Sequence, residues 1–579
     1  MKRKESRPDI VVTNGQLVNV YTGEIYRADV VVGGSRIVRL DESSASRKDS
    51  VSVIDAEGAY LVPGLLDGHI HIECSKLSIT MFAQAVVPCG TTSVVSGLDQ
   101  IFSVAGLEGV RDFLEESKAT PLKLFWGAPF KMPYTIPAST LGHNFGPREH
   151  KVAQSWPECV GVWETVREFV CGRDKETFEA MRIAARNRLP VFGCAPMATG
   201  AALSEYVAAG VRADHECYSA PETYEKLRNG MSIMIRESSV AHFLKENIKV
   251  VTESKLDARR IGFCTDDVTA TDILRKGHVD ELVRLAIGEG VDPVRAIQMA
   301  TINCAEIYRI DNSVGSITPG RIADVLVIDK PEAFNVLKVI ANGKLTAVNH
   351  KMLTELRPPH RSRRLTRTFH VKKVKGAELT VKTPRRLSRA RVLSMKMSDD
   401  VPFVRKRRDV ELGVRNGVVQ PDVEQDALYV TVVERYGKTS HKPTAFISGF
   451  GLKQGAMASS SSPDDNNILC VGTNSEDMAY AINHIIRNQG GQVVVKDSKV
   501  LEFLPLPIGG IVADFEPEEM SRRENTLDDA ARSLGCRFGK PFMYMIFLSV
   551  TAIPDYAITD RGLVDYVSLK VISPVIGPA

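Results

Sequence analysis

Runs of apolar residues alternate with helix-like segments through the middle of the chain, from about residue 64 to residue 308. The apolar runs are strand-like and are separated by longer amphipathic stretches. Strands that alternate with helices over roughly 250 residues predict a (β/α)8 barrel of the TIM type, in which catalytic groups lie at the carboxyl ends of the strands. The clearest of these runs are 91–95, 122–126, 160–163, 189–192 and 233–235.

Shorter strand-like runs precede this region, and turn residues separate them at Asn14-Gly15 and Gly33-Gly34. They predict a small β domain at the start of the chain. The runs are 10–12, 16–20, 29–32 and 36–40.

The last part of the chain, from about residue 392, predicts a further α/β domain. It contains the apolar run Leu428–Val433, a loop rich in Gly and Ser, and a helix-like segment around residues 477–487.

Composition supports an ordinary globular protein of two or three domains, because 579 residues are too many for one core. The net charge of +4 is too small to argue for nucleic acid as a partner. No apolar run is long enough to span a bilayer, and the start MKRKESRPD leads into no signal-peptide core, so we expect a cytoplasmic protein without a membrane partner. Ten cysteines without paired spacing are expected to stay thiols.

Arginine and lysine are frequent between residues 357 and 391. One interpretation is an arm that binds nucleic acid. The other is a solvated linker with strand edges, and it is favoured because β-like runs interrupt the basic stretch and acidic segments offset it elsewhere.

Two histidines end the strand-like approach at residues 59–71, and they are separated by one residue. Alternate residues of a β-strand share a face, so the imidazoles of His69 and His71 can point at one spot. Imidazole is a common ligand of Zn, Mn or Fe, although two incidental histidines at a strand end remain the alternative. The whole string from Pro63 to His71, PGLLDGHIH, resembles the first-strand signature of the amidohydrolase superfamily.

Further segments resemble the adenine deaminase family within that superfamily, and they are spread over nearly the whole chain. The resemblance implies hydrolytic deamination of adenine to hypoxanthine and ammonia at a two-metal site. It also implies a small heterocyclic substrate and a homo-oligomer, dimer or higher. The segments are 200–216, 234–237, 277–280, 299–303, 449–453, 472–474, 504–510, 542–547 and 558–565.

Domain limits follow from the same resemblance. Residues 315–328, GSITPGRIADVLVI, resemble the stretch with which amidohydrolase barrels close and the chain re-enters a β-sandwich. We therefore expect a composite β-sandwich domain from residues 1–63 and 312–390, a barrel at 64–311, and an adenine-deaminase-type C-terminal domain at 391–579.

The resemblance adds three metal ligands to His69 and His71. Glu164 follows the strand-like run 160–163, His215 lies in the segment ADHEC, and Asp266 lies in the segment FCTDD. Carboxylates mixed with imidazoles suit Mn, Fe or Zn, and one or two ions are expected per subunit.

These residue types fit metal-assisted hydrolysis. A divalent metal lowers the pKa of water toward neutrality and so makes hydroxide available. Glu164 is expected to bridge two metals, and Asp266 is expected to take the proton from water and pass it to the leaving nitrogen. Glu216 or Asp267 is an alternative candidate for this proton transfer. The other possibility is that either residue only orients an imidazole.

One departure from the family lies among the ligands. The family's G-H-A-P reads Gly193-Cys194-Ala195-Pro196 here. A thiolate binds Zn or Fe, so Cys194 is a candidate ligand, and as a sulfur donor it would favour softer metal ions than imidazole does. The alternative is a small buried residue beside a site for a single metal.

Other departures concern the expected substrate side. The family's D-P-H-E-I reads GLDQI at 97–101, its A-H-D-S-H-N reads SPDDNN at 462–467 with Asp464 and Asn467 retained, and the loop 127–146 offers different polar groups. Candidate substrate ligands are Arg236, Glu237 and Asp99, and Arg236 and Glu237 are equally interpretable as an internal ion pair.

Three functions remain open from the sequence. The first is an aminohydrolase of adenine or a related purine, and the second is a hydrolase of a cyclic amide, imide or other heterocyclic C–N bond on the same scaffold. The third is a non-catalytic paralogue, which the retained ligand set argues against.

Overall fold

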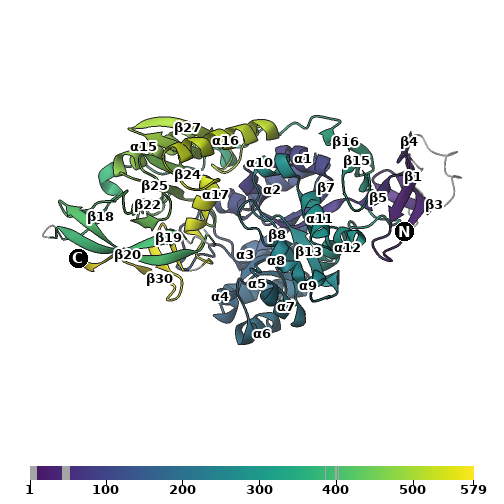
Figure 1. Ribbon diagram of the computed structural model, residues 1–579, viewed down its shortest axis with the longest axis horizontal. Helices are drawn as coiled ribbons and strands as arrows, with labels where there is room; N and C mark the ends of the chain where they lie inside the picture. Colours follow the sequence, from purple (N-terminus) through teal and green to yellow (C-terminus); the bar gives the residue numbers. More distant parts are fainter. Residues whose placement is uncertain (1–8, 42–51, 385–386, 398–400, 402, 554) are drawn as a thin grey trace.

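The computed structural model describes residues 9–41, 52–384, 387–397, 401, 403–553 and 555–579. The first eight residues and positions 385–386 of the basic stretch therefore lie outside the described part of the chain. In Figure 1 the barrel occupies the middle of the molecule, between a small β domain near the N-terminus and a sheet domain that carries the C-terminus.

The predicted (β/α)8 barrel is confirmed. Its strands follow one another in chain order around a parallel sheet. The ring closes between the first and last strands, where Ile70 bridges to Asp266. The strands are β6 (Leu65–Ile70), β7 (Thr91–Ser96), β8 (Lys123–Pro129), β9 (Cys159–Val166), β10 (Val191–Cys194), β11 (Val211–Asp214), β12 (Ser232–Arg236) and β13 (Ile261–Cys264).

Helices surround this barrel (Figure 1). A cluster of apolar side chains from its strands fills part of the interior. That cluster includes Leu66, Val95, Val160 and Phe192, so the polar side chains at the other end of the strands lie above a packed floor. The helices are α1 (Ile79–Val86), α2 (Asp99–Lys118), α3 (Pro147–Ala153), α4 (Arg167–Cys171), α5 (Lys175–Arg186), α6 (Gly200–Ala208), α7 (Ala220–Arg228), α8 (Leu244–Asn247), α9 (Lys249–Thr252), α10 (Ala270–Lys276), α11 (Val279–Gly288), α12 (Pro293–Met299) and α13 (Ile302–Tyr308).

Strands from both flanks of the barrel form one hydrogen-bonded sheet, as the sequence predicts. Alternate residues of β1, β2 and β14, among them Val12, Val30 and Val325, share one core. The break predicted at Asn14-Gly15 is instead a register shift inside a continuous β1, with Asn14 at φ 58°. The strands are β1 (Ile10–Val18), β2 (Ile25–Gly33), β3 (Arg36–Asp41), β4 (Ser52–Asp55), β5 (Tyr60–Pro63), β14 (Val325–Ile328), β15 (Val336–Ala341), β16 (Lys344–Val348) and β17 (Lys351–Met352).

The C-terminal domain is built on a large mixed sheet. One face of the sheet, with Tyr429 and Val433 of β22, packs with Ile482 of α15, while Val430 and Val432 contribute to the core on the other face. The sheet strands are β18 (Val381–Lys382), β19 (Arg389–Met397), β20 (Arg405–Arg415), β21 (Val418–Val419), β22 (Leu428–Val433), β23 (Thr444–Ser448), β24 (Ala456–Ser459), β25 (Ile468–Gly472), β26 (Gly491–Lys496), β27 (Lys499–Pro505) and β31 (Val575–Pro578).

Further elements of this part lie around the sheet or lead into it. They are α14 (Arg363–Thr366), α15 (Ser475–Asn488), α16 (Pro517–Ser533), α17 (Pro541–Ile546) and a separate small sheet of β28 (Tyr556–Thr559), β29 (Gly562–Asp565) and β30 (Lys570–Ile572).

Two groups of ion pairs fasten the C-terminal domain to the barrel. Lys76, just after the first barrel strand, donates to Glu524 of α16 at 2.8 Å, and both side chains are buried. Arg361 of the basic stretch contacts Glu116 of α2 and Asp514 of the C-terminal domain. The described part of the basic stretch thus contributes to packing between domains.

Within the described residues, none of the helices combines the length and the apolar character needed to cross a membrane.

Replacing Lys76 with Met tests how strongly the domains depend on each other. Glu524 would keep its bonds to Thr271 but lose its cation, so we expect unfolding to become easier by about 3 kcal/mol, measured by thermal and urea denaturation. The double change K76M/E524Q should recover most of the loss. As a control, R182M removes a largely exposed ion pair with Glu179 and should cost no more than about 1 kcal/mol. A loss in K76M no larger than in R182M would contradict this interpretation.

Candidate functional site

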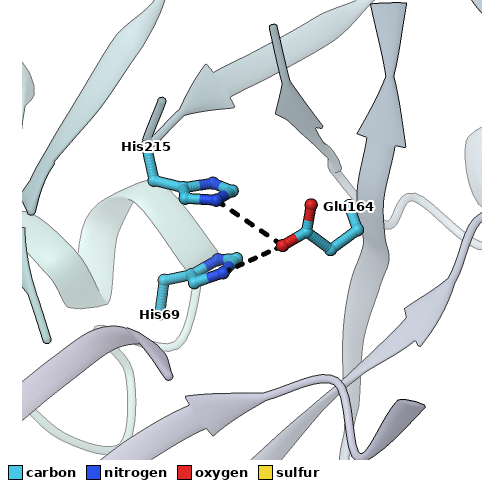
Figure 2. A group of neighbouring side chains, drawn as sticks. All are labelled: His69, Glu164 and His215. Carbon is cyan, nitrogen blue, oxygen red and sulfur yellow. Dashed lines mark ion pairs between the residues drawn. The ribbon is translucent and has the colours of Figure 1, made fainter. Parts of the chain in front are cut away.

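Three imidazoles and two carboxylates converge above the barrel floor. The Nε2 atoms of His69, His71 and His215 lie 3.1, 3.3 and 3.5 Å from Oε1 of Glu164. Figure 2 shows two of these rings, His69 and His215, side by side and facing the glutamate. Asp266 Oδ1 lies 3.7 Å from His69 Nε2 and 3.5 Å from His71 Nε2. The structure therefore brings together the five ligands expected from the sequence.

Barrel closure positions three of these side chains. The amide of His71 donates to the carbonyl of Asp266, and the amide of Asp266 donates to the carbonyl of His69, both at 3.0 Å. The two histidines and the aspartate thus lie on paired backbone at the seam between β6 and β13.

Both carboxylate residues have left-handed backbone conformations. Glu164 has φ 52° inside β9, and Asp266 has φ 57° just after β13. Such conformations are costly for residues with a Cβ and persist only where surrounding structure imposes them, which is a feature of functional sites.

Ring stacking fixes the central imidazole. His69 lies between the ring of Trp163, with centroids 3.9 Å apart, and the ring of His215, with centroids 3.7 Å apart. A Cβ at Gly97 or Gly127 would come within 2.5 Å of Trp163, so these glycines leave the space that the indole needs.

Hydrogen bonds on the far side of two rings set the direction of their Nε2 atoms. His71 Nδ1 lies 3.3 Å from Oδ1 of Asp99, and the hydroxyl of Tyr134 donates to the other oxygen of Asp99 at 2.6 Å. His215 Nδ1 donates to the carbonyl of Gly193 at 3.2 Å. A proton held at Nδ1 leaves the Nε2 lone pair free to bind a metal.

The donor set fits a divalent cation. Nε2 of His69 is buried and has no hydrogen-bond partner among the described residues, although it faces two carboxylates. Three overlapping groups have ligand atoms within 4.8 Å of one another. A metal ion bound between these imidazole nitrogens and carboxylate oxygens would accept their lone pairs and so explain why they lie close together without a shared proton. The groups are His69-Glu164-His215, His69-His71-Asp266 and Cys194-His215-Glu216.

Cys194 ends β10 and lies in the third of these groups. Without a cation, burial and the nearby charges of Glu164 and Glu216 raise the pKa of its thiol well above the ordinary value. Its position beside His215 is compatible with a ligand, and its role stays a prediction.

Arg236 lies at the end of β12 and holds two carboxylates of the site. It donates to Glu216 at 2.7 Å and makes a very short contact with Asp266. Burial acts to raise the pKa of Asp266, but Arg236, His71 and His69 lower it to about 2. The side chain predicted to bind substrate therefore contacts the two carboxylates expected to move protons.

Two other predicted residues have different surroundings. Asp99 supports His71 and also lines the cavity over the ligand set. Glu237 is not among the cavity-lining residues. Its carboxylate contacts Nδ1 of His242 at 2.6 Å and accepts from the amide of Leu244, so it does not pair with Arg236.

The C-terminal domain supplies one wall of the cavity over the ligands. Phe403, Phe547 and Ile553 form part of an apolar cluster that also contains Val240 and Ala241 of the barrel. Sequence reasoning missed this wall, because apolar residues in a C-terminal segment look like ordinary core residues. The cavity-lining residues are His71, Asp99, Tyr134, Glu164, Val166, Cys194, Pro196, His215, Glu216, Tyr218, Arg236, Ala241, Asp266, Asp267, Phe403, Pro463, Asp464, Phe547, Val550, Ala552 and Ile553.

A buried arginine organises this wall. Arg405, the first residue of β20, is fully buried and donates only to backbone carbonyls. Its guanidinium thereby joins the strand to the segment 547–556 and fixes the lining residues carried by that segment. The carbonyls belong to Phe403, Phe547, Val550, Ile553 and Tyr556.

Comparisons with known proteins agree over both large domains. Residues 60–346 match the Amidohydrolase family, and residues 402–570 match the Adenine deaminase C-terminal domain. The chain is 53% identical over 578 residues to adenine deaminase 4 of Rhizobium meliloti (strain 1021), which covers 99% of this chain and 96% of that protein. It is 55% identical to adenine deaminase 1 of Desulfotalea psychrophila, in an alignment that covers 98% of this chain and 95% of that protein. It is 36% identical to adenine deaminase of Moorella thermoacetica, where the alignment covers 98% of this chain and 96% of that protein.

Replacing Arg405 with Met tests the wall. Several buried carbonyls would lose their donors, at about 1–3 kcal/mol each, so we expect the free energy of unfolding to fall by at least about 3 kcal/mol in denaturation experiments. R405K should lie between wild type and R405M because lysine has fewer donors. The control is R407M, two residues along the same strand, where the side chain is half exposed and should be nearly neutral. Equal stability of R405M and R407M would show that Arg405 does not hold the wall.

Proposed function

The chain belongs to the adenine deaminase family of the amidohydrolases, and on this basis we propose that it hydrolyses adenine to hypoxanthine and ammonia. Membership makes it a metal-dependent hydrolase of C–N bonds. The observation that carries the proposal is the convergence of three Nε2 atoms on Glu164 beside Asp266.

The metal would be held by His69, His71, Glu164, His215 and Asp266. We propose two ions of Mn, Fe or Zn, with Cys194 as a ligand of the second, because the ligand groups overlap at His69 and His215. Bound there, a divalent metal supplies hydroxide at neutral pH by acidifying water.

The chain's own groups account for the proton balance. Water adds its oxygen to the carbon that carries the amino group, and a carboxylate oxygen of Asp266 takes the proton. The same proton then passes to the amino nitrogen as the C–N bond breaks and ammonia leaves. Arg236 keeps Asp266 and Glu216 in place during this transfer, and Glu216 is a second candidate for the relay.

The wall residues support a flat, mostly apolar substrate. Phe403 and Phe547 line the same cavity as the polar ligand set, so a bound planar ring would contact both apolar and polar side chains. Enclosure also keeps bulk water away from the reacting atoms. The homo-oligomeric state and cytoplasmic location expected from the sequence are part of this proposal.

Metal content and turnover of adenine test the proposal together. Protein produced with added Mn, Fe or Zn should contain close to two ions per chain by elemental analysis and should release ammonia from adenine. D266N should lower kcat by about 10²- to 10⁴-fold, since it removes the proton acceptor. D174N makes the same chemical change at the start of α5, outside the site, and should leave turnover unchanged.

Two outcomes would overturn parts of this assignment. Bound metal without turnover of adenine would exclude adenine as substrate and direct the search to cyclic amides, imides and other heterocycles. Failure to bind metal under every condition would remove the catalytic assignment.

A further inference from the structure

One carboxylate of the cavity differs from all the others that line it. Asp464 lies in the loop between β24 and β25 of the C-terminal domain and is 8% exposed. Its Oδ2 atom is fully buried and, among the described residues, has no hydrogen-bond partner. The side chain lines the same cavity as the metal-ligand candidates.

Each of the remaining acids of the cavity contacts a possible donor through at least one oxygen, although Oε2 of Glu216 is itself buried without a partner among the described residues. Asp99 accepts from Tyr134, and both Glu216 and Asp266 accept from Arg236. Asp267 accepts from the thiol of Cys74, and Glu164 faces the three imidazoles.

The surroundings of Asp464 make an unpaired carboxylate costly. Burial, followed by the charges of Asp99, Glu164 and Asp465, raises the pKa of its carboxyl well above the ordinary value. Buried polar atoms in native proteins are nearly always paired, and an unpaired one calls for an explanation such as a ligand. A donor from a bound molecule would complete this site.

Hydrogen bonds along the loop hold Asp464 in place. Ser549 donates to the carbonyl of Pro463 at 2.5 Å, and the amide of Asn466 donates to the carbonyl of Ser462 at 2.7 Å. Asn467 donates to the carbonyl of Thr140 in the barrel loop at 3.2 Å. The carboxylate is therefore presented by a fixed backbone, as a site that orients a ligand requires.

We propose that Asp464 is a specificity-determining residue that accepts a hydrogen bond from a ring N–H of the substrate. It acts from the C-terminal domain, while the barrel provides the metal-ligand candidates, so a heterocycle held by both is oriented at two points. The assignment rests on the proposed deamination of adenine. It selects heterocycles that carry a free ring N–H and rejects those alkylated at that nitrogen.

Methylated substrates test this contact in the wild-type enzyme. Adenine has an N–H on its five-membered ring, at N9 or N7, and methylation at N9 or N7 removes that donor. We expect at least one of 9-methyladenine and 7-methyladenine to have a kcat/KM lower than that of adenine by 10-fold or more, since Asp464 would stay unpaired. Equal turnover of all three compounds would overturn the proposal without any variant.

The variant D464N identifies the residue responsible. Replacing one carboxyl oxygen with an amide NH2, which donates instead of accepting, should lower kcat/KM for adenine by roughly 10- to 100-fold, mainly through KM, and leave the value for the disfavoured methyl compound unchanged. D465N is the matched control, because Asp465 is also buried but does not line the cavity. Thermal denaturation of both variants establishes that they are folded.

These results distinguish a failure of the proposed function from a failure of the role of Asp464. Metal-loaded wild type that turns over no adenine would overturn the proposed function and the role of Asp464 with it. An active wild type whose preference for adenine over the methyl compounds survives in D464N would overturn only the role of Asp464. Loss of activity in D465N equal to that in D464N would also count against it, since the effect would not depend on the cavity.

Discussion

The backbone pairing between the end of β6 and Asp266, two residues after β13, is the constraint on which the site depends. Two backbone hydrogen bonds join His69 and His71 to Asp266 across the seam that closes the barrel. Residues nearly two hundred positions apart in the chain are thereby fixed as neighbours, and their side chains point into the same space. Glu164 lies in β9 and His215 directly follows β11, and both side chains reach the same space above the apolar barrel floor.

Patterns of neighbouring residues predicted the features that depend on neighbouring residues, namely strands, helices and the face that a side chain occupies. The alternation of apolar runs with helices gave the barrel, and the spacing of His69 and His71 placed both imidazoles on one face of a strand. Asn14-Gly15 was predicted as a break between strands because these residues favour turns. In the structure β1 pairs with β2 both before and after them, so they form an irregularity within one strand. The positions of Glu164, His215 and Asp266 were expected from family resemblance, since no local pattern states which strand ends meet.

Contacts between segments far apart in the chain could not be predicted from the sequence. Arg236 was expected near substrate, whereas the fold places it between Glu216 and Asp266. Asp99 was also expected near substrate, and it lines the cavity while its carboxylate contacts His71, one of the expected ligands. The wall made by Phe403 and Phe547 depends on the buried guanidinium of Arg405, whose five carbonyl partners are spread over about 150 residues, a pattern that periodicity does not register.

The order of these parts along the chain has a consequence for biosynthesis. A ribosome makes the ligand-bearing strands first and the segment that carries Phe547 and Ile553 well after them. Domains fold largely in the order of their synthesis, so a nascent barrel presents its cluster of imidazoles and carboxylates to solvent before the wall exists. Ions can reach the ligands during that interval without passing a closed cavity. Truncation near the C-terminus would then leave a barrel with its ligands in place and its substrate chamber open.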